Sequence, residues 1–242
     1  MKIAVVGKGG AGKTTTSAIL ARTLARAGHR VVALDCDTNP NLGLSLGLGI
    51  EATEALLSVR DAVGGDVEHA KTWHQIVERF GADAPDGVRL AMVSKIDQPE
   101  FGCPCCGISP EQLLGLDIPE GTVVVADFEA GLGTLTRLGE TKVDAVVVVT
   151  DPTVKSLEVA VRAAGLAEEH TSGPVVIVAN RVIDDADRQS VERVLLGRAL
   201  VVVPDDLAIP AADRADVAPL DASPDAPAVV ALCGLASLLP AG

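Results

Sequence analysis

The chain has 242 residues, enough for one large α/β domain with a buried core. Hydrophobic residues make up 48% and aromatic residues only 2%, so the core must be built from Ala, Val, Leu and Ile, as in a parallel sheet buried on both faces. The formal net charge of −13 repels phosphate backbones, and the sequence has no basic run or aromatic platform for stacked bases. Nucleic acid is therefore not an expected partner.

Hydropathy and cysteine content indicate the compartment. No apolar stretch approaches the roughly 18 residues that a membrane span needs, and the sequence runs from Met1 directly into the first predicted strand. The five cysteines do not resemble a secreted disulfide framework, because three of them crowd at positions 103, 105 and 106. We expect a cytoplasmic protein that does not bind membranes, with metal or redox chemistry at the crowded cysteines.

A phosphate-binding loop, Gly7–Thr14, follows the first predicted strand, Ile3–Val6, and precedes a helical pattern, Ser17–Ala27. Its glycines let backbone N–H groups turn toward a phosphate chain. Lys13 reaches the β and γ oxygens, and the hydroxyl of Thr14 ligates Mg²⁺. The strand before the loop and the helix after it are the context that confirms this motif. The predicted phosphate-binding residues are Gly9, Gly10, Ala11, Gly12, Lys13, Thr14 and Thr15.

A second lysine, Lys8, follows the first glycine of the loop. Taken alone, it is a solvated loop charge. Together, Lys8–Thr15 resembles the deviant phosphate loop of the MinD/ParA, nitrogenase iron protein and arsenite-pump ATPase group. In that family the extra lysine crosses a dimer interface to the partner's phosphates. The resemblance implies a nucleotide-sandwich homodimer in which Lys8 acts in trans and Lys13 in its own subunit.

Two carboxylates, Asp35 and Asp37, follow the second predicted strand, Arg30–Leu34. They stand at the carboxyl end of a strand beside the phosphate loop, where ligands bind in open α/β sheets. The stretch resembles the family's first switch, in which the aspartate aligned with Asp37 polarises the attacking water. Asp37 then orients a water or holds Mg²⁺ through one. The alternative is that both aspartates are helix-capping or turn residues.

The next segments read as two helices and a strand. A helical pattern runs from Leu44 to about Arg60, and a second runs from Val67 to Phe80 after a Gly-Gly break. The second pattern places Trp73, Ile76, Val77 and Phe80 on one apolar stripe, for which core packing is favoured over partner docking. The third predicted strand is Val88–Val93.

The cysteine loop Phe101–Gly107 follows that strand. Thiolates two residues apart on an extended segment both turn toward one soft metal ion, and tetrahedral Zn²⁺ or square-planar Ni²⁺ accepts such donors. One chain offers at most three close sulfurs, whereas a two-fold axis through the loop supplies two cysteines from each subunit. The candidate ligands are Cys103 and Cys105, with Cys106 as a possible third. Buried or incidental thiols without a ligand remain the alternative.

A C-x-C pair inside a phosphate-loop ATPase resembles the CooC branch of the group, whose members insert nickel during maturation of carbon monoxide dehydrogenase. In that branch such a pair bridges the dimer, and the matching residues here are Cys103 and Cys105. The pattern does not require Cys106. An iron–sulfur cluster like that of the nitrogenase iron protein is the rival, but it draws a ligand from just after the next switch. No cysteine occurs between Asp127 and Arg137, which disfavours it unless Cys105 and Cys106 replace that ligand.

The next apolar strand, Thr122–Ala126, ends at Asp127, followed by a glycine-containing stretch through Gly133. The placement suits an aspartate that holds the Mg²⁺ shell, followed by a switch that moves when the γ-phosphate leaves. Asp-x-Glu-Ala-Gly again resembles the CooC branch. Glu129 is equally well explained as a solvated charge or as a partner of Arg137.

The base-binding residues are predicted at the ends of the last strands. Asp144–Thr150 is followed by a helix, Thr153 to about Glu169, and the strand Pro174–Ala179 ends at Asn180 and Arg181. In the family the aligned asparagine binds adenine. Guanine-specific relatives need an aspartate where Ile183 stands, so ATP is favoured over GTP. Pro204 and Asp206, after the strand Ala199–Val203, begin a loop that in the family passes over the base.

The remainder contains an acidic segment and a final helix. Asp213–Pro227 reads as an irregular acidic surface segment, and Ala228–Leu239 as an apolar helix packed on the sheet. This helix lacks the Lys/Arg face of a membrane-targeting tail.

The sequence therefore predicts a single P-loop NTPase domain over residues 1–242, a doubly wound, mostly parallel sheet with helices on both faces. The expected function is that of an ATP-hydrolysing, Mg²⁺-dependent metallochaperone, which binds Ni²⁺ or Zn²⁺ between two subunits and inserts it into a client metalloenzyme such as carbon monoxide dehydrogenase. The alternatives are a ParA/MinD-type positioning ATPase without metal and an iron–sulfur electron-transfer ATPase.

Overall fold

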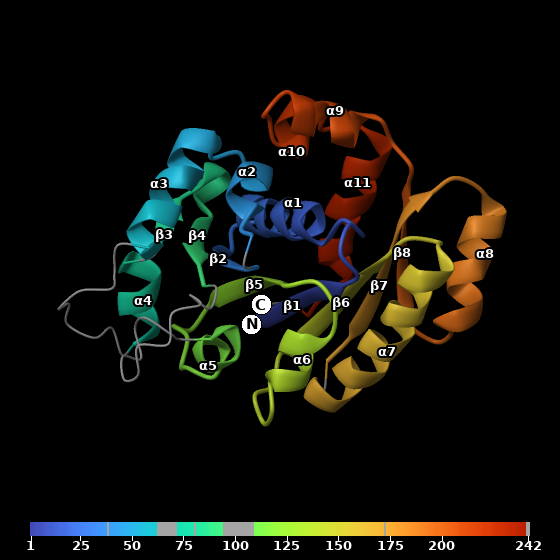
Figure 1. Cartoon of the computed structure of the whole chain (residues 1–242), viewed down its shortest axis with the longest axis horizontal. Helices are drawn as coiled ribbons and strands as arrows, with labels where there is room; N and C mark the ends of the chain where they lie inside the picture. Colours follow the sequence, from blue (N-terminus) through green and yellow to red (C-terminus); the bar gives the residue numbers. More distant parts are fainter. Residues whose placement is uncertain (38, 62–71, 80, 94–108, 172, 241–242) are drawn as a thin grey trace.

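The computed structural model describes residues 1–37, 39–61, 72–79, 81–93, 109–171 and 173–240, and all of their strands join one sheet (Figure 1). Its order is β3-β4-β2-β5-β1-β6-β7-β8, and only β3 runs antiparallel to its neighbour. The strands are β1 Lys2–Gly7, β2 Arg30–Cys36, β3 Gly81–Asp83, β4 Arg89–Met92, β5 Thr122–Phe128, β6 Ala145–Thr150, β7 Val175–Val182 and β8 Ala199–Pro204. The expected doubly wound, mostly parallel sheet is confirmed.

Helices cover both faces of the sheet (Figure 1). One face packs against α1 Lys13–Arg26, α2 Leu42–Leu46, α3 Ile50–Asp61 and α11 Pro227–Gly234, which is followed by the 3-10 turn η2 Leu235–Leu238. The opposite face packs against α4 Trp73–Arg79, α5 Pro110–Leu114, α6 Gly133–Arg137, α7 Val154–His170 and α8 Asp185–Val194. The remaining described elements are the 3-10 turn η1 Pro85–Gly87 and the helices α9 Ala208–Arg214 and α10 Pro219–Ala222.

The central strands are buried on both sides, which explains their continuous apolar sequence. In β1, Ile3 and Val5 contact the layer that contains α1, whereas Ala4 and Val6 contact the layer that contains α7. Fully burying a Val, Leu or Ile side chain contributes about 1.5–3 kcal/mol relative to leaving it exposed. β-Branched residues also favour the extended backbone, so burial and local preference select the same structure.

Several boundaries differ from the sequence predictions. The helix expected from Leu44 to Arg60 is two helices, α2 and α3, because Gly47 caps α2 in the left-handed conformation with φ of 95°. The short edge strand β3 and the polar helix α8 were not predicted. The buried positions of Trp73, Ile76 and Val77 confirm core packing for the apolar stripe; the last member of that stripe, Phe80, lies outside the described residues.

The prediction of an irregular surface segment from Asp213 to Pro227 is wrong in part. The segment contains the end of α9 and the whole of α10, and its residues Ala218, Pro219 and Leu220 are buried. Their burial holds α10 against the rest of the fold. The final helix is shorter than expected, since α11 ends at Gly234.

Among the residues that the structure describes, no helix combines the length and the apolar character required to cross a bilayer.

Candidate functional site

The predicted site residues lie along one edge of the sheet, where the parallel strands end. The phosphate loop follows β1, Asp37 follows β2, and Asp127 is the sixth of the seven residues of β5. β7 and β8 end at Val182 and Pro204 on the other side of β1. Because β1 separates these two groups in the sheet, the edge has a phosphate end beside β2 and β5 and a base end beside β7 and β8.

Backbone and side-chain hydrogen bonds fix the phosphate loop. The N–H of Ala11 donates to the carbonyl of Lys8 at 3.2 Å, and the N–H of Gly131 donates to the carbonyl of Gly7 at 3.1 Å. The side-chain amide of Asn180 donates to the carbonyl of Ala11 at 2.8 Å. A Cβ on Gly12 would lie 2.3 Å from that amide nitrogen, so only glycine permits this contact. Asn180 thus stabilises the conformation of the phosphate loop. The sequence did not indicate this contact.

Lys13 is buried at the start of α1, with 7% of its surface exposed. Burial lowers the pKa of its ammonium group, and the nearby charges of Asp127, Asp37 and Glu129 oppose that shift. The side chain is therefore surrounded by acidic groups at the phosphate end, and an ammonium held in this way attracts phosphate oxygens.

Asp127 is buried opposite Asp35, its register partner in the β2–β5 pair. The hydroxyl of Ser17 donates to its carboxylate at 3.1 Å. Burial raises the pKa of Asp127 to about 6, against the opposing effects of a hydrogen bond with Thr14, the charge of Lys13 and the bond from Ser17. Burial thus disfavours the ionised form of this carboxylate, and a nearby cation would stabilise it.

Asp35 is a turn residue, which is the alternative that the sequence left open for it. Its two carboxylate oxygens accept hydrogen bonds from the N–H groups of Leu42, at 2.8 Å, and Asp37, at 3.2 Å. Burial, and next the charge of Asp127, raise the pKa of Asp35 to about 7. Asp35 therefore shapes the turn that leads into α2.

Asp37 is partly exposed, and its carboxylate accepts a hydrogen bond from the N–H of Asn39 at 2.9 Å. This is a turn contact within the described residues, and a carboxylate has further lone pairs that can accept from water or a ligand. The structure thus brings Asp37, Asp127 and Lys13 together, as the sequence predicted for their positions.

The oxygen groups at the phosphate end suit a hard divalent cation. Mg²⁺ prefers carboxylate, hydroxyl and water oxygens and keeps several waters when it binds with phosphates. The Thr14 hydroxyl and the carboxylate of Asp127 are hydrogen-bonded neighbours. Asp37 is close enough that its charge raises the pKa of both Asp127 and Lys13. A cation here offsets the burial that raises the pKa of Asp127. These residues therefore fit Mg²⁺.

A cavity of about 690 Å³ opens at the base end, next to the phosphate loop. Its volume is in the range of small-molecule sites. Gly12 and Thr15 line it at the phosphate loop, and the predicted base residues Asn180, Arg181 and Pro204 line it further along the edge. Other walls come from segments that carried no motif: Leu44, Ser45, Ile50, Ile209, Val217, Pro219 and Leu232 are among them.

The carboxylate of Asp206 also lines the cavity, but its oxygens are bound to backbone. One accepts a hydrogen bond from the N–H of Ala208 at 2.9 Å and the other from the N–H of Ala228 at 3.1 Å. Asp206 therefore holds the first turns of α9 and α11 together. Arg181 is exposed with a φ of 57°, beside the irregular pairing of β7 with β8.

The remaining predicted residues are less buried than Lys13, or lie outside the described residues. Here the rim means the partly exposed start of the phosphate loop, at Lys8. Lys8 is partly exposed, in contrast to buried Lys13. Arg137 donates to the carboxylate of Glu111 at 2.6 Å. The cysteine loop with Cys103, Cys105 and Cys106 lies outside the described residues. Within the described ranges, no three His, Cys, Asp or Glu side chains form a cluster suited to a metal ion.

Sequence reasoning missed Ser17 and the walls formed by α2 and the α9–α10 segment. Ser17 lies one turn after Lys13 on the buried side of α1, so helical spacing from the loop is a signal that points to it. The cavity walls have no such signal, because they come from separate segments that the fold brings together.

Comparison with known proteins agrees with this geometry. The family model described as the CobQ/CobB/MinD/ParA nucleotide binding domain matches residues 2–220. The carbon monoxide dehydrogenase accessory protein CooC of Rhodospirillum rubrum is 32% identical over 93% of this chain and 91% of its own length. Among solved structures, septum site-determining protein MinD of Pyrococcus horikoshii, complexed with Mg-ADP, is similar with a TM-score of 0.69. That similarity covers 97% of this chain and 93% of the other at 18% identity, which concerns the fold alone.

Proposed function

Because the chain belongs to the CobQ/CobB/MinD/ParA family of nucleotide-binding domains, we propose that it is a CooC-like, ATP-hydrolysing metallochaperone. It is a P-loop ATPase that uses ATP and Mg²⁺. The finer parts of the proposal are a homodimer closed around ATP, a nickel or zinc ion bound between the subunits, and delivery of that ion to carbon monoxide dehydrogenase. We place the activity in the cytoplasm, within a single domain of residues 1–242.

The observation that carries the ATPase part is the convergence of Lys13, Asp37 and Asp127 beside a cavity of about 690 Å³. The phosphate loop supplies backbone N–H groups for the phosphates, and Lys13 adds a positive charge. The cavity continues from Gly12 past Asn180 to Pro204 and leaves room for the base and ribose. The phosphates thus fit the phosphate end of the site, and the base and ribose fit the cavity at the base end.

Hydrolysis in this site depends on positioning and charge. Asp37 orients a water for attack on the γ-phosphate. Lys13 stabilises the charge that develops on the phosphate oxygens, and Thr14 and Asp127 would hold Mg²⁺ nearby. Mg²⁺ supplies further positive charge when it is bound. Ser17 orients the Asp127 carboxylate through its 3.1 Å hydrogen bond.

The contrast between the two lysines of the loop supports the dimer. Lys13 is buried among the carboxylates of its own chain, whereas Lys8 is partly exposed at the rim and Gly9 and Gly10 beside it are exposed. A partly exposed lysine beside a phosphate site is accessible to a second subunit, which supports this part of the proposal. Lys8 therefore acts on the phosphates of the partner subunit.

The metal part rests on the sequence of the cysteine loop and on the likeness to CooC. Cys103 and Cys105 from each of two subunits complete a four-sulfur site, which suits Zn²⁺ or Ni²⁺. Closure around ATP brings the two loops together, and hydrolysis separates them. By linkage, metal favours the ATP-bound dimer as much as ATP favours metal binding.

The test is nickel insertion into nickel-free carbon monoxide dehydrogenase, followed by its activity in the presence of this protein, ATP, Mg²⁺ and limiting Ni²⁺. We expect activation that requires ATP and is lost in a Cys103→Ser/Cys105→Ser variant. The matched control is Cys233→Ser, because Cys233 is a free, partly buried cysteine on α11. Full activation by the double variant would contradict the metallochaperone.

The MinD/ParA likeness keeps a metal-free switch ATPase as the second candidate. That function predicts ATP-dependent binding to a membrane or to DNA, unchanged by the two cysteine substitutions. An iron–sulfur ATPase predicts instead a visible chromophore in protein purified without oxygen. The same preparations therefore separate the three functions.

A further inference from the structure

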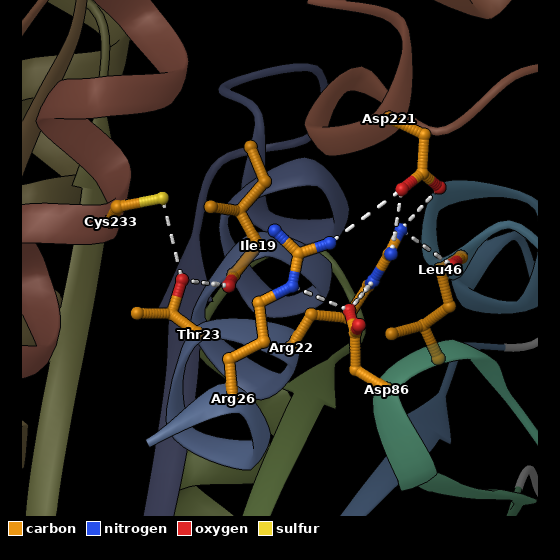
Figure 2. A network of polar contacts seen from close by, with 8 residues as sticks. All are labelled: Ile19, Arg22, Thr23, Arg26, Leu46, Asp86, Asp221 and Cys233. Carbon is orange, nitrogen blue, oxygen red and sulfur yellow. Dashed lines mark hydrogen bonds and ion pairs between the residues drawn. The ribbon is translucent and has the colours of Figure 1, made fainter. Parts of the chain in front are cut away.

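A buried arginine on α1 joins three segments of the chain, two of which, α2 and α10, line the cavity; Figure 2 shows its polar contacts. Arg22 is 2% exposed. Its two terminal nitrogens donate to the two carboxylate oxygens of Asp221 at 2.6 and 2.7 Å, and its Nε donates to Asp86 at 2.6 Å. One terminal nitrogen also donates to the carbonyl of Leu46 at 3.3 Å. A single guanidinium group thus contacts α10, η1 and the end of α2.

Two of the segments that Arg22 joins also supply walls of the cavity, whereas η1 does not line it. Leu44 and Ser45 of α2 line it, as do Val217 and Pro219 at the start of α10. The same cavity is lined by Thr15, which lies seven residues before Arg22 on α1. Residues separated by seven share a helix face, at a distance of about 10 Å along the axis. Arg22 is therefore two turns behind the phosphate loop, on the side of α1 that faces these walls.

The α9–α10 wall depends on tertiary contacts. α9 has seven residues and α10 four, and helices this short are not stable alone. A bidentate arginine–carboxylate pair is among the stronger polar contacts, and its geometry fixes orientation as well as distance. The hydrogen bond from Arg22 holds the pKa of Asp221 below its usual range, so the pair stays ionised at neutral pH.

The fit between α2 and α10 is close. A Cβ on Gly47, the left-handed cap of α2, would lie 3.3 Å from the Cβ of Ala218 and 3.4 Å from a carboxylate oxygen of Asp221. The two cavity walls thus touch at the point where Arg22 binds both. A shift of α10 moves the wall that contains Pro219.

We propose that Arg22 is a positioning residue for nucleotide binding: through Asp221 and the carbonyl of Leu46 it holds α10 and α2 in place around the base end of the cavity. The inference rests on the proposed function, in which this cavity receives the base of ATP. Arg26 assists, since its Nε donates to Asp86 at 2.9 Å and its terminal nitrogen is 3.7 Å from Asp221. Arg26 is exposed and makes no bond to α2 that the structure records, so its contribution is smaller.

The test compares two ligands that share phosphates and differ in the base. Titration calorimetry measures Mg²⁺-dependent binding of a non-hydrolysable ATP analogue and of inorganic tripolyphosphate to wild type and to Asp221→Asn. The substitution preserves shape at a side chain that is 42% exposed, so the protein folds. If the wall is closed in only a tenth of the variant molecules, the analogue binds about tenfold more weakly. Tripolyphosphate binding stays unchanged, because it needs only the phosphate end.

Kinetics provides the second readout. For Asp221→Asn we expect a KM for ATP raised by a similar factor and an unchanged kcat, with recovery in Asp221→Glu, which restores the carboxylate. Glu168→Gln is the matched control, because Glu168 also pairs with an arginine, Arg198, at 2.6 Å, next to the start of β8 and away from the cavity.

Four outcomes contradict the account, at different levels. Analogue affinity unchanged in Asp221→Asn overturns the positioning role, as does an equal loss for both ligands. A wild-type protein that binds tripolyphosphate but not the ATP analogue overturns the positioning role while preserving the phosphate site. A wild-type protein that binds neither ligand overturns the proposed function itself.

Discussion

The phosphate end and the base end of the site are built on different physical principles. At the phosphate end, Lys13, Asp35 and Asp127 are buried, and burial shifts the pKa of each away from its ordinary value. At the base end, Asn180 and Asp206 are bound to backbone groups, so their polar atoms maintain the walls of the cavity. The phosphate end thus acts through charge held out of water, and the base end acts through shape.

Among the substitutions that test this comparison, loss of Lys13 should have the largest effect on nucleotide binding and hydrolysis. Lys13→Ala removes the buried ammonium group beside Asp37 and Asp127. Nucleotide binding and hydrolysis should therefore fall by at least about 100-fold. Phosphate release and nucleotide titration measure the two effects. Lys155→Ala, at an exposed position of α7, is the control and should match wild type. Retained hydrolysis in Lys13→Ala would remove the phosphate-loop assignment.

Lys8→Ala separates the two lysines of the loop. Since Lys8 lies at the rim, ATP binding by the monomer should stay within about threefold of wild type, a change of less than 1 kcal/mol. Dimer closure should fail, and hydrolysis should fall by about 1,000-fold, as for other charges supplied in trans. Light scattering with an ATP analogue reports the dimer. An active, dimeric variant would eliminate the role in trans.

Asp206→Ala tests whether the base end depends on structure. The substitution removes the acceptor for the N–H groups of Ala208 and Ala228, which costs about 1–2 kcal/mol in the free energy of unfolding. For a chain of this size the Tm should fall by about 2–4 °C per kcal/mol. Asp205→Asn, at the exposed neighbouring position, should leave the Tm unchanged. If Asp206 instead contacts the base directly, Asp206→Ala should lose much of its ATP affinity while its Tm stays unchanged.

The last prediction concerns pH. In the ligand-free protein with EDTA, the folded-state pKa of Asp35 is about 7, above the value of about 3.9 of an unfolded chain. The folded state therefore holds its proton more tightly, and stability from this group is lost as the pH rises from about 4 to about 7. Asp35→Asn does not titrate there. The Tm of wild type minus that of the variant should be lower at pH 8 than at pH 5, and an equal difference would refute the effect of burial.

The phosphate end was predictable because its signals are local. The sequence Gly7–Thr14 contains the loop, and Asp37 and Asp127 each follow an apolar strand whose place in a parallel sheet sets their position. Burial on both faces also made most strands recognisable as apolar runs. Residue type and order were therefore sufficient for the doubly wound, mostly parallel sheet and for the positions of Lys13, Asp37 and Asp127, although not for the contacts of Ser17 and Asn180.

The base end was less predictable because its walls come from distant segments. The buried end of the acidic segment was read as surface, since its many Asp, Ala and Pro residues resemble a loop. Its residue Asp221 pairs with Arg22, almost 200 positions earlier in the chain, and no local pattern indicates that pair. Asn180 lines the cavity, and its amide nitrogen also donates to the phosphate loop, a contact that no local pattern indicates.

The most direct test of the central claim is metal stoichiometry per dimer under reducing, oxygen-free conditions, measured with ADP and with a non-hydrolysable ATP analogue. The account predicts about one nickel or zinc ion per dimer, because two cysteines from each subunit complete a four-sulfur site. Binding should be stronger with the ATP analogue, be lost in Cys103→Ser/Cys105→Ser and be kept in Cys233→Ser. No bound metal with either nucleotide would contradict the metallochaperone and leave a metal-free switch ATPase.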